Sequence, residues 1–223
     1  MSSEFVHLHN HSDYSLLDGA QRVDQLVNTI DDLNMDSVAL TEHGNMFSVI
    51  PFYNKARESG VKPIIGCEIY VAEGSRFDKK PKADGGWGNN HLILLVQNYL
   101  GYKNLMKLVT FGYLEGFYYR PRIDMDLLQE YNDGLICLSA CLKGEIPEKM
   151  LKGDHDGAKQ AALGFAEIFP DRYYLEIQDH GIAEEKTNLL NMKKLASELD
   201  LPLVCTNDAH YAKHNHSEAH DIH

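Results

Sequence analysis

The sequence alternates short, continuously apolar runs with segments whose apolar residues recur at helical spacing. This alternation restricts the possible folds more than any other feature, because strands that alternate with helices indicate β/α units. Continuous apolar runs are typical of parallel strands covered on both faces. We expect strands at 5–11, 37–44, 61–73, 91–98, 134–140, 173–178 and 202–208, and helices at 23–34, 47–60, 102–116, 154–168 and 184–200. The fold class is therefore α/β, as a doubly wound open sheet or as a barrel.

Two features indicate where the expected helices and strands are interrupted. Gly60 is expected to end the second helix, since glycine is common just past a helix C-terminus. The segment 74–90, rich in Gly, Lys, Asp and Pro, predicts a flexible surface excursion between the third and fourth strands.

Composition narrows the class of protein. A length of 223 residues suits one large domain or two small ones, and 43% hydrophobic residues allow a sizeable core. No apolar run approaches the roughly 20 residues of a membrane span. The N-terminus does not resemble a secretory signal, and the four cysteines form no CxxC pair. We therefore expect a cytoplasmic protein that does not bind a membrane.

The charge balance bears on nucleic acid binding. Acidic residues outnumber basic ones by 33 to 21, for a formal net charge of −12. A protein that holds DNA by itself usually shows the opposite balance. Binding to DNA would therefore require positive charge from bound cations or from partner domains.

Side chains of metal-ligand type lie at the ends of the expected strands or on the loops that follow them, and one, Glu68, lies within the third strand. They are His9, His11, Asp18, His43, Glu68, Cys141, Asp208 and His210. Catalytic groups of parallel β/α folds gather at the carboxyl ends of strands. A barrel collects those ends into one ring, whereas an open sheet spreads them out, so we prefer the barrel. His91 begins its strand, so it would reach the ring only if the chain runs out after Glu68 and returns on the same side.

His7, His9 and His11 alternate in "VHLHNH". Alternate side chains of a strand point to one face, so the three imidazoles would stand together. Neutral imidazoles gain little from such crowding and charged ones repel, which makes a metal ion the usual physical reason for it.

Other residues of the same types have plainer interpretations. A lone histidine is most often a surface residue, a glutamate before a helix can cap it, and an isolated cysteine behaves as a small core residue. We expect these roles for His155 and His214 on the surface, for Glu42 as a helix cap, and for Cys137 and Cys205 in the core. Packing does not account for the ligand-type residues together, since imidazole and charged groups are rarely buried without partners.

Eight spaced blocks of the sequence resemble a known family. The blocks are "VHLHNHSDYSLLDG", "ALTEHGNM", "PIIGCEIYVA", "HLILLVQN", "GFYYRPRID", "CLSACLKGEI", "YYLEIQDHG" and "CTNDAHY". In this order they resemble the PHP (polymerase and histidinol phosphatase) family, in the branch found at the N-terminus of bacterial DNA polymerase III alpha subunits. The match spans nearly the whole chain. It implies a distorted (β/α)7 TIM-like barrel, with residues 1–223 as a single PHP domain, and we expect this domain to be a piece of a longer polymerase chain.

The resemblance also implies a ligand set of up to three divalent metals. By motif, one metal would use His9, His11, Glu68 and Asp208, a second would use Glu68, His91 and Cys141, and a third would use Asp18, His43 and His210. His7 stands where general PHP proteins have the first Asp of Asp-x-His-x-His, so we hold it apart from the ligands. Cys141 stands where many PHP phosphatases have a histidine, and a thiolate still binds zinc. Mixed ligands of this kind suit zinc, manganese or iron, with magnesium as a further option.

Several side chains would serve the chemistry of such a site. The predicted catalytic carboxylates are those of Asp18, Glu68 and Asp208. Arg120 and Arg122 in "FYYRPRID" are candidates for bidentate phosphate contacts, or are solvent-facing loop residues. The neighbouring pair, Tyr118 and Tyr119, would stack on a ligand or belong to the core.

Three functional classes remain open from the sequence. The first is a metal-dependent 3′–5′ exonuclease that proofreads a DNA 3′ end, because clustered divalent ions assist in-line phosphoryl displacement. The second is a phosphatase of small phosphomonoesters, as in the histidinol phosphatase relatives. The third is a metal-braced scaffold that docks a separate proofreading exonuclease. The partners implied by the resemblance are a DNA 3′ end, polymerase domains of the same chain, a proofreading subunit and a sliding clamp.

Overall fold

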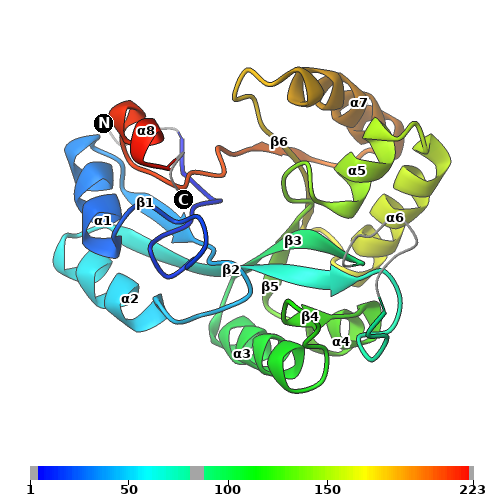
Figure 1. Ribbon diagram of the computed structural model, residues 1–223, viewed down its shortest axis with the longest axis horizontal. Coiled ribbons are helices and arrows are strands. Elements are labelled where there is room, and N and C mark those ends of the chain that lie inside the picture. The colour runs from blue at the N-terminus through cyan, green and yellow to red at the C-terminus, as the bar shows by residue number, and fades with distance from the viewer. Residues whose placement is uncertain (1–4, 81–87, 221–223) are drawn as a thin grey trace.

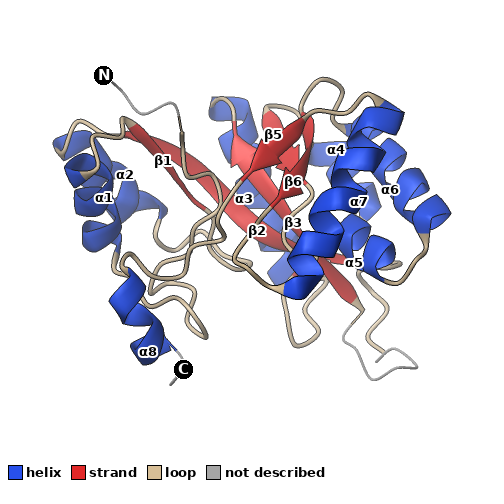
Figure 2. Ribbon diagram, turned by 90° about the horizontal axis from the view of Figure 1, so that it is seen from above, coloured by secondary structure: helices blue, strands red, loops and turns tan. Residues whose placement is uncertain are grey.

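A curved sheet surrounded by helices forms the framework of the protein in the computed structural model, which describes residues 5–80 and 88–220 (Figure 1). In this part of the chain the sheet has seven strands in the order β1-β2-β3-β5-β6-β7, with β4 beside β2. The strands are β1 Ser37–Leu40, β2 Lys62–Ala72, β3 Asn89–Val96, β4 Arg122–Ile123, β5 Leu135–Leu138, β6 Tyr173–Ile177 and β7 Leu203–Cys205. Seen from above, the helices flank this sheet on opposite sides (Figure 2).

The N-terminal segment closes the sheet between its two edges. His7 bridges Val38 of β1, and Asn10 bridges Ala209 just after β7. His11 N donates to Ala209 O at 2.9 Å, which ties the first segment to the last. The closed, irregular barrel that results confirms the predicted distorted TIM-like fold. The predicted strand at 5–11 is wrong in detail, because two isolated bridges with a bend between them replace a continuous ladder.

β3 runs against its neighbours, which corrects the expectation of parallel strands throughout. It is antiparallel to both β2 and β5, whereas the pairs β1–β2, β2–β4, β5–β6 and β6–β7 are parallel. A parallel pair needs a crossover connection, usually a helix, while an antiparallel pair needs only a turn. The described residues between β2 and β3 contain turns and bends and no helix, so the chain returns along the strand it has just left.

The helices form the outer layer. They are α1 Val23–Asp32, α2 Val49–Glu58, α3 Tyr99–Leu114, α4 Met125–Tyr131, α5 Glu145–Leu151, α6 His155–Ile168, α7 Ala183–Leu199 and α8 Ser217–His220, the last preceded by a 3-10 turn at His214–His216. The five predicted helices are confirmed to within a few residues. Gly60 follows α2 with a φ of +74°, in the left-handed region that favours glycine, so the predicted stop is also confirmed. The short helices α4 and α5 were not predicted from periodicity.

The two faces of β3 explain its continuously apolar sequence. Leu92 and Leu94 pack outward against the helix layer, while Ile93 and Leu95 pack into the barrel interior. All four side chains are buried, and each contributes roughly 1.5–3 kcal/mol of hydrophobic stabilisation. The inward row changes from apolar to polar at its N-terminal end, where His91 shares the face of Ile93, and this change marks one end of the barrel as a polar site.

Several single-residue predictions can now be compared with the structure. His155 and His214 are exposed and Cys137 is buried, as expected, but Cys205 is exposed, so its predicted core role is wrong. Asn89 and Asn90 of the expected excursion belong to β3, and residues 81–87 lie outside the described residues. No helix among those described is long and apolar enough to cross a membrane.

The start of the excursion at 74–90 is held in place, contrary to the expectation of a flexible segment. The Arg76 guanidinium contacts Glu115 at 2.6 Å and Asp124 at 2.9 Å. Two ion pairs on one guanidinium therefore anchor this stretch to the end of α3 and the start of α4.

Candidate metal centre

All nine predicted ligand residues meet at the polar end of the barrel. They come from the N-terminal segment, the loop before α1, the ends of β1, β5 and β7, and from within β2 and β3. Three groups have ligand atoms within 4.8 Å of one another: His9, His11, Glu68 and Asp208; Glu68, His91 and Cys141; and His11, His43 and His210. Asp18 lies beside the third group. Because Glu68 and His11 each belong to two groups, the cluster is continuous.

The first group has the spacing of a tetrahedral metal site. His9 Nε2 lies 2.9 Å from Glu68 Oε2, 3.1 Å from His11 Nε2 and 3.1 Å from Asp208 Oδ1, which is also 3.1 Å from His11 Nε2. Zinc bonds of about 2.0–2.1 Å in a tetrahedron place ligand atoms about 3.3 Å apart. Asp208 Oδ1 is buried and accepts no hydrogen bond from the described residues. Two imidazole nitrogens facing each other and a carboxylate without a donor fit a cation between them.

The second group depends on the register of β2 and β3. Glu68 pairs with Ile93, so His91, two residues away, lies on the same face as the diagonal neighbour of Glu68. His91 Nδ1 lies 2.8 Å from Glu68 Oε1 and 3.9 Å from Cys141 Sγ. A tetrahedral zinc with one sulfur ligand would separate sulfur and nitrogen by about 3.6 Å. The condition set by the sequence, that the chain run out after Glu68 and return beside it, is therefore confirmed.

The Cys141 thiol needs a cation to act as a ligand. Burial, with Glu68 and Asp208 nearby, raises the pKa of the Cys141 thiol well above its usual value.

Two residues of the cluster region have left-handed backbone: Ala140, just before Cys141, has a φ of +64°, and Asp208 has a φ of +45°. Left-handed backbone at residues other than glycine is strained and clusters at functional sites. The strained backbone at Ala140 and Asp208 therefore lies in the turns that position Cys141 and Asp208 in the cluster.

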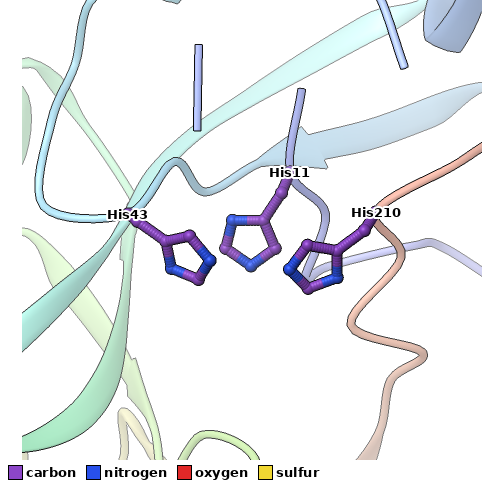
Figure 3. Close-up of side chains that lie close together, drawn as sticks. All are labelled: His11, His43 and His210. Atoms are coloured by element: carbon purple, nitrogen blue, oxygen red, sulfur yellow. The ribbon is translucent and has the colours of Figure 1, made fainter. Parts of the chain in front are cut away.

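Three imidazoles form the third group (Figure 3). The His11 ring stacks with each of the other two, with its centroid 3.9 Å from that of His43 and 4.5 Å from that of His210, and the centroids of those two rings lie 5.6 Å apart. Asp18 Oδ2 lies 3.1 Å from His43 Nε2 and 3.8 Å from His210 Nε2. The structure thus adds His11 to the three residues that the resemblance implies, and Asp18 Oδ1, like Asp208 Oδ1, is buried without a hydrogen-bond donor among the described residues.

Two carboxylates behind the cluster orient its histidines. His9 Nδ1 lies 2.7 Å from Glu176 Oε1, so Nε2 is the atom that faces the metal position. On the other side, His11 Nδ1 lies 3.3 Å from Ser15 Oγ, which donates to Glu42 at 2.6 Å. Such outer partners fix ring orientation and raise ligand basicity. Glu42 is therefore an internal support and not the predicted helix cap.

Sequence reasoning missed Glu176. The signal available was a glutamate inside the apolar run "YYLEI", at a position that the closed barrel buries to 1% exposure. A charged side chain is rarely buried without a partner. The partner, His9, lies 167 residues away in sequence, so the pair is visible only in the fold.

Without metal, the histidines and carboxylates of the cluster shift one another's pKa values. Burial alone would raise the pKa of Glu68, but His91 and His43 lower it well below its usual range. Burial alone would lower the pKa of His43, but Glu68 and Asp18 raise it to about 10. The pKa of His11 falls to about 4, chiefly because of burial. Neutral His11 is ready to coordinate, whereas His43 must lose a proton to a metal.

A pocket of about 790 Å³ opens over the cluster. It is lined by Asp18, His43 and His91 of the cluster and by Tyr70 and Arg120. The guanidinium carbon of Arg120 lies 5.7 Å from the centroid of the Tyr70 ring. Arg120 is therefore placed to meet an anion that enters the pocket.

Arg122 occupies a different environment, which removes it from the candidate phosphate contacts. Its side chain is 2% exposed, and it donates to the backbone oxygens of Gly116, Arg76 and Asp78 at 3.1, 3.2 and 2.9 Å. It is neither a phosphate ligand nor the alternative solvent-facing residue. Tyr119, whose core role was considered, is 60% exposed.

The family of the chain follows from sequence comparison. The PHP domain family matches residues 7–180. The chain belongs to the PHP family. It is 49% identical over 220 residues to the DNA polymerase III subunit alpha of Borreliella burgdorferi (strain ATCC 35210 / DSM 4680 / CIP 102532 / B31), covering 99% of this chain and 19% of that protein. It is 43% identical to the protein of the same name from Deinococcus radiodurans, covering 98% of this chain and 17% of that protein. The chain thus spans about a fifth of the length of these curated relatives.

A solved structure shows the same fold. The chain superposes on a putative metal-dependent phosphoesterase from Bifidobacterium adolescentis with a TM-score of 0.53 and 12% identity. The superposition covers 95% of this chain and 90% of the other. A structural similarity at 12% sequence identity shows a shared fold and does not show a shared function.

Proposed function

We propose that this chain is a metal-dependent phosphoesterase whose substrate is the 3′ end of a DNA strand, which it hydrolyses as a 3′–5′ exonuclease. The observation that carries the proposal is the continuous ligand cluster, in which Glu68 offers one carboxylate oxygen to each of two groups. A carboxylate shared between neighbouring groups is the arrangement expected where two ions act on one substrate.

The donor set fits two or three divalent cations, with imidazole, carboxylate and thiolate favouring zinc, manganese or iron. Such ions, when bound, polarise a phosphoryl oxygen and lower the pKa of water. In our proposal Glu68 and Asp208 are the buried ligands that set the geometry. Asp18, whose side chain is 40% exposed, is the cluster carboxylate best placed to accept a proton at the pocket.

Arg120 supplies the substrate contact in this proposal. It lines the pocket together with Asp18 and His43, and a guanidinium presents several N–H donors to a phosphate in a fixed planar geometry. It also offsets the negative charge of the incoming phosphate on a chain whose formal charge is −12. Bound divalent cations would extend this offset, because they are the largest local charges in such a site.

The choice of DNA rests on the relatives, which are named DNA polymerase III subunit alpha. We propose on the same basis that residues 1–223 act as a single PHP domain within a longer polymerase chain. A proofreading subunit and a sliding clamp are the further partners that this proposal implies. The site chemistry itself is equally suited to a phosphomonoester.

The test combines elemental analysis with two assays on one preparation. The loaded chain is expected to contain two or three divalent ions and to shorten single-stranded or mismatched DNA 3′ ends faster than it hydrolyses small phosphomonoesters. His11→Ala and Asp208→Asn should each abolish cleavage while the far-UV circular dichroism stays unchanged. Rapid hydrolysis of phosphomonoesters with intact DNA ends would replace the exonuclease proposal by a phosphatase. If the fully metal-loaded chain has neither activity, the remaining hypothesis is the metal-braced scaffold that docks a separate exonuclease.

A further inference from the structure

An exposed aromatic groove runs from the metal centre across the protein surface. We define the aromatic groove by Leu16, Leu17, Phe47, Tyr113, Phe117 and Tyr119. It has a volume of about 310 Å³ and shares Asp18, His43, Tyr70 and Arg120 with the pocket over the metal cluster. The two hollows therefore adjoin, and the candidate ligands Asp18 and His43 line both of them.

The rings of the groove are unusually accessible. Phe47 is 61% exposed, Tyr119 60%, Phe117 48% and Tyr113 40%. Tyr113 and Phe117 stack with centroids 6.2 Å apart and an interplanar angle of 23°. Soluble proteins rarely leave contiguous apolar patches in water unless the patch binds something.

The charge of the groove differs from that of the rest of the surface. Asp18 and Arg120 are the only acidic or strongly basic residues among its described lining, on a chain with a formal charge of −12. Arg120 lines both the groove and the pocket, so its positive charge lies where the two hollows meet. A ligand with an anionic backbone could contact Arg120, and flat apolar groups on the same ligand could contact the aromatic rings of the groove.

We propose that the aromatic groove binds the unpaired bases of a single-stranded polynucleotide whose terminal phosphodiester lies in the metal pocket. The inference rests on the proposed phosphoesterase function and names the part of the substrate that the groove holds. Aromatic side chains stack on any base face, and proteins that bind single strands combine such rings with cationic contacts to the backbone. A phosphodiesterase acting at a strand end must also hold the nucleotide next to the one it removes, and the groove is the adjoining surface.

Binding of a labelled oligothymidylate of about 12 nucleotides, with cleavage-resistant phosphorothioate linkages, tests the proposal by fluorescence anisotropy at low salt. The protein is the whole 223-residue chain with its metals. Phe117→Ala and Phe47→Ala should each weaken binding roughly 5- to 150-fold, the range found for loss of one stacked base. Tyr99→Ala is the matched control, because Tyr99 is 73% exposed on α3 and does not line the groove. It should leave the affinity unchanged.

Two further measurements separate stacking from general apolar contact. Phe117→Trp should preserve affinity and Phe117→Leu should lose it, because leucine keeps apolar volume but has no ring. An oligonucleotide with abasic sites should bind wild type and Phe117→Ala equally weakly. The proposal is overturned if Phe117→Ala and Phe47→Ala bind as wild type does, if Phe117→Leu binds fully, or if the abasic strand binds as well as the thymidylate.

The outcomes also separate this proposal from the function on which it rests. Ring-dependent binding by a loaded chain that cleaves no phosphoester supports the groove and refutes the phosphoesterase. Cleavage of DNA ends by variants that bind as wild type does supports the phosphoesterase and refutes the groove. A groove that serves a protein partner instead would show no ring dependence for the oligonucleotide, which overturns the proposal. Should Phe117→Ala fail to fold, Phe47→Ala and Phe117→Leu carry the test.

Discussion

Replacing Glu68 by glutamine should damage metal loading more than replacing any other single ligand. Its Oε2 atom lies 2.9 Å from His9 Nε2, and its Oε1 atom lies 2.8 Å from His91 Nδ1 and 2.6 Å from His43 Nδ1. Glutamine keeps the size of the side chain but removes the negative charge that both groups share. The second group would then keep only His91 and Cys141 as protein ligands of full strength, so we expect the metal content to fall by at least one ion per chain.

The loss can be measured as stability. An ion that binds only the folded chain at 100 times its Kd stabilises it by about 2.7 kcal/mol. For a domain of this size each kcal/mol corresponds to about 2–4 °C in melting temperature. Each ion should therefore raise the melting temperature by roughly 5–10 °C. Glu68→Gln should reduce the difference in melting temperature between metal-loaded and chelator-treated protein by at least that amount.

The assay compares the difference between loaded and chelated samples in wild type and variant, because this comparison cancels any loss of stability that is independent of metal. Glu130→Gln, on an exposed part of α4, is the matched control and should change nothing. Inductively coupled plasma analysis gives the ion count in parallel. An unchanged ion count and an unchanged chelator shift in Glu68→Gln would refute the assignment of Glu68 as a shared ligand.

Three further predictions address the residues around the cluster. Glu176→Gln should weaken metal affinity roughly 10- to 100-fold without removing a ligand, because it removes the negative charge that raises the basicity of the His9 ring. Competition with a chromogenic chelator measures this affinity. Arg122→Met should lower stability by about 3 kcal/mol or more, because it leaves three backbone carbonyls without a buried donor, while Arg120→Met should leave stability unchanged and raise KM. For His180, burial lowers the pKa, but Glu185 at 2.7 Å and a backbone carbonyl raise it above 6.5 overall. The stability lost in His180→Gln should therefore be greatest below about pH 6.5 and should disappear as the pH rises through the folded-state pKa; a loss that grows with pH would contradict this sign.

The sequence was informative wherever the signal is local. Helical periodicity predicted five helices, because it depends on residues three or four apart along one segment. Residue types at the ends of apolar runs identified the nine ligand candidates, because imidazole and carboxylate groups at such positions have few structural roles. The short helices α4 and α5 were missed, since seven residues give too few turns for a periodic pattern.

Errors arose where a contact joins distant parts of the chain. Cys205 looked like a core residue in an apolar run, but its strand is short and lies at an edge of the sheet, where its side chain is exposed. Arg120 and Arg122 looked alike in the sequence. The backbone carbonyls that surround only Arg122 come from segments up to 46 residues away. Glu42 looked like a helix cap because only its neighbours in the sequence could be considered. The two serines that donate to it lie about 30 residues earlier, and only the fold brings them to it.

The sequence by itself determined the inventory of this protein: the β/α alternation, the apolar interior and the ligand types spaced along the chain. Only the tertiary structure decided which of them meet. The reversal of β3 places His91 beside Glu68, and the N-terminal segment brings His9 and His11 against Asp208 while closing the barrel. Local patterns fix which face of a segment is buried, but strand direction and register depend on pairing between segments far apart in the chain. The candidate metal centre forms because those long-range pairings converge on one end of the barrel.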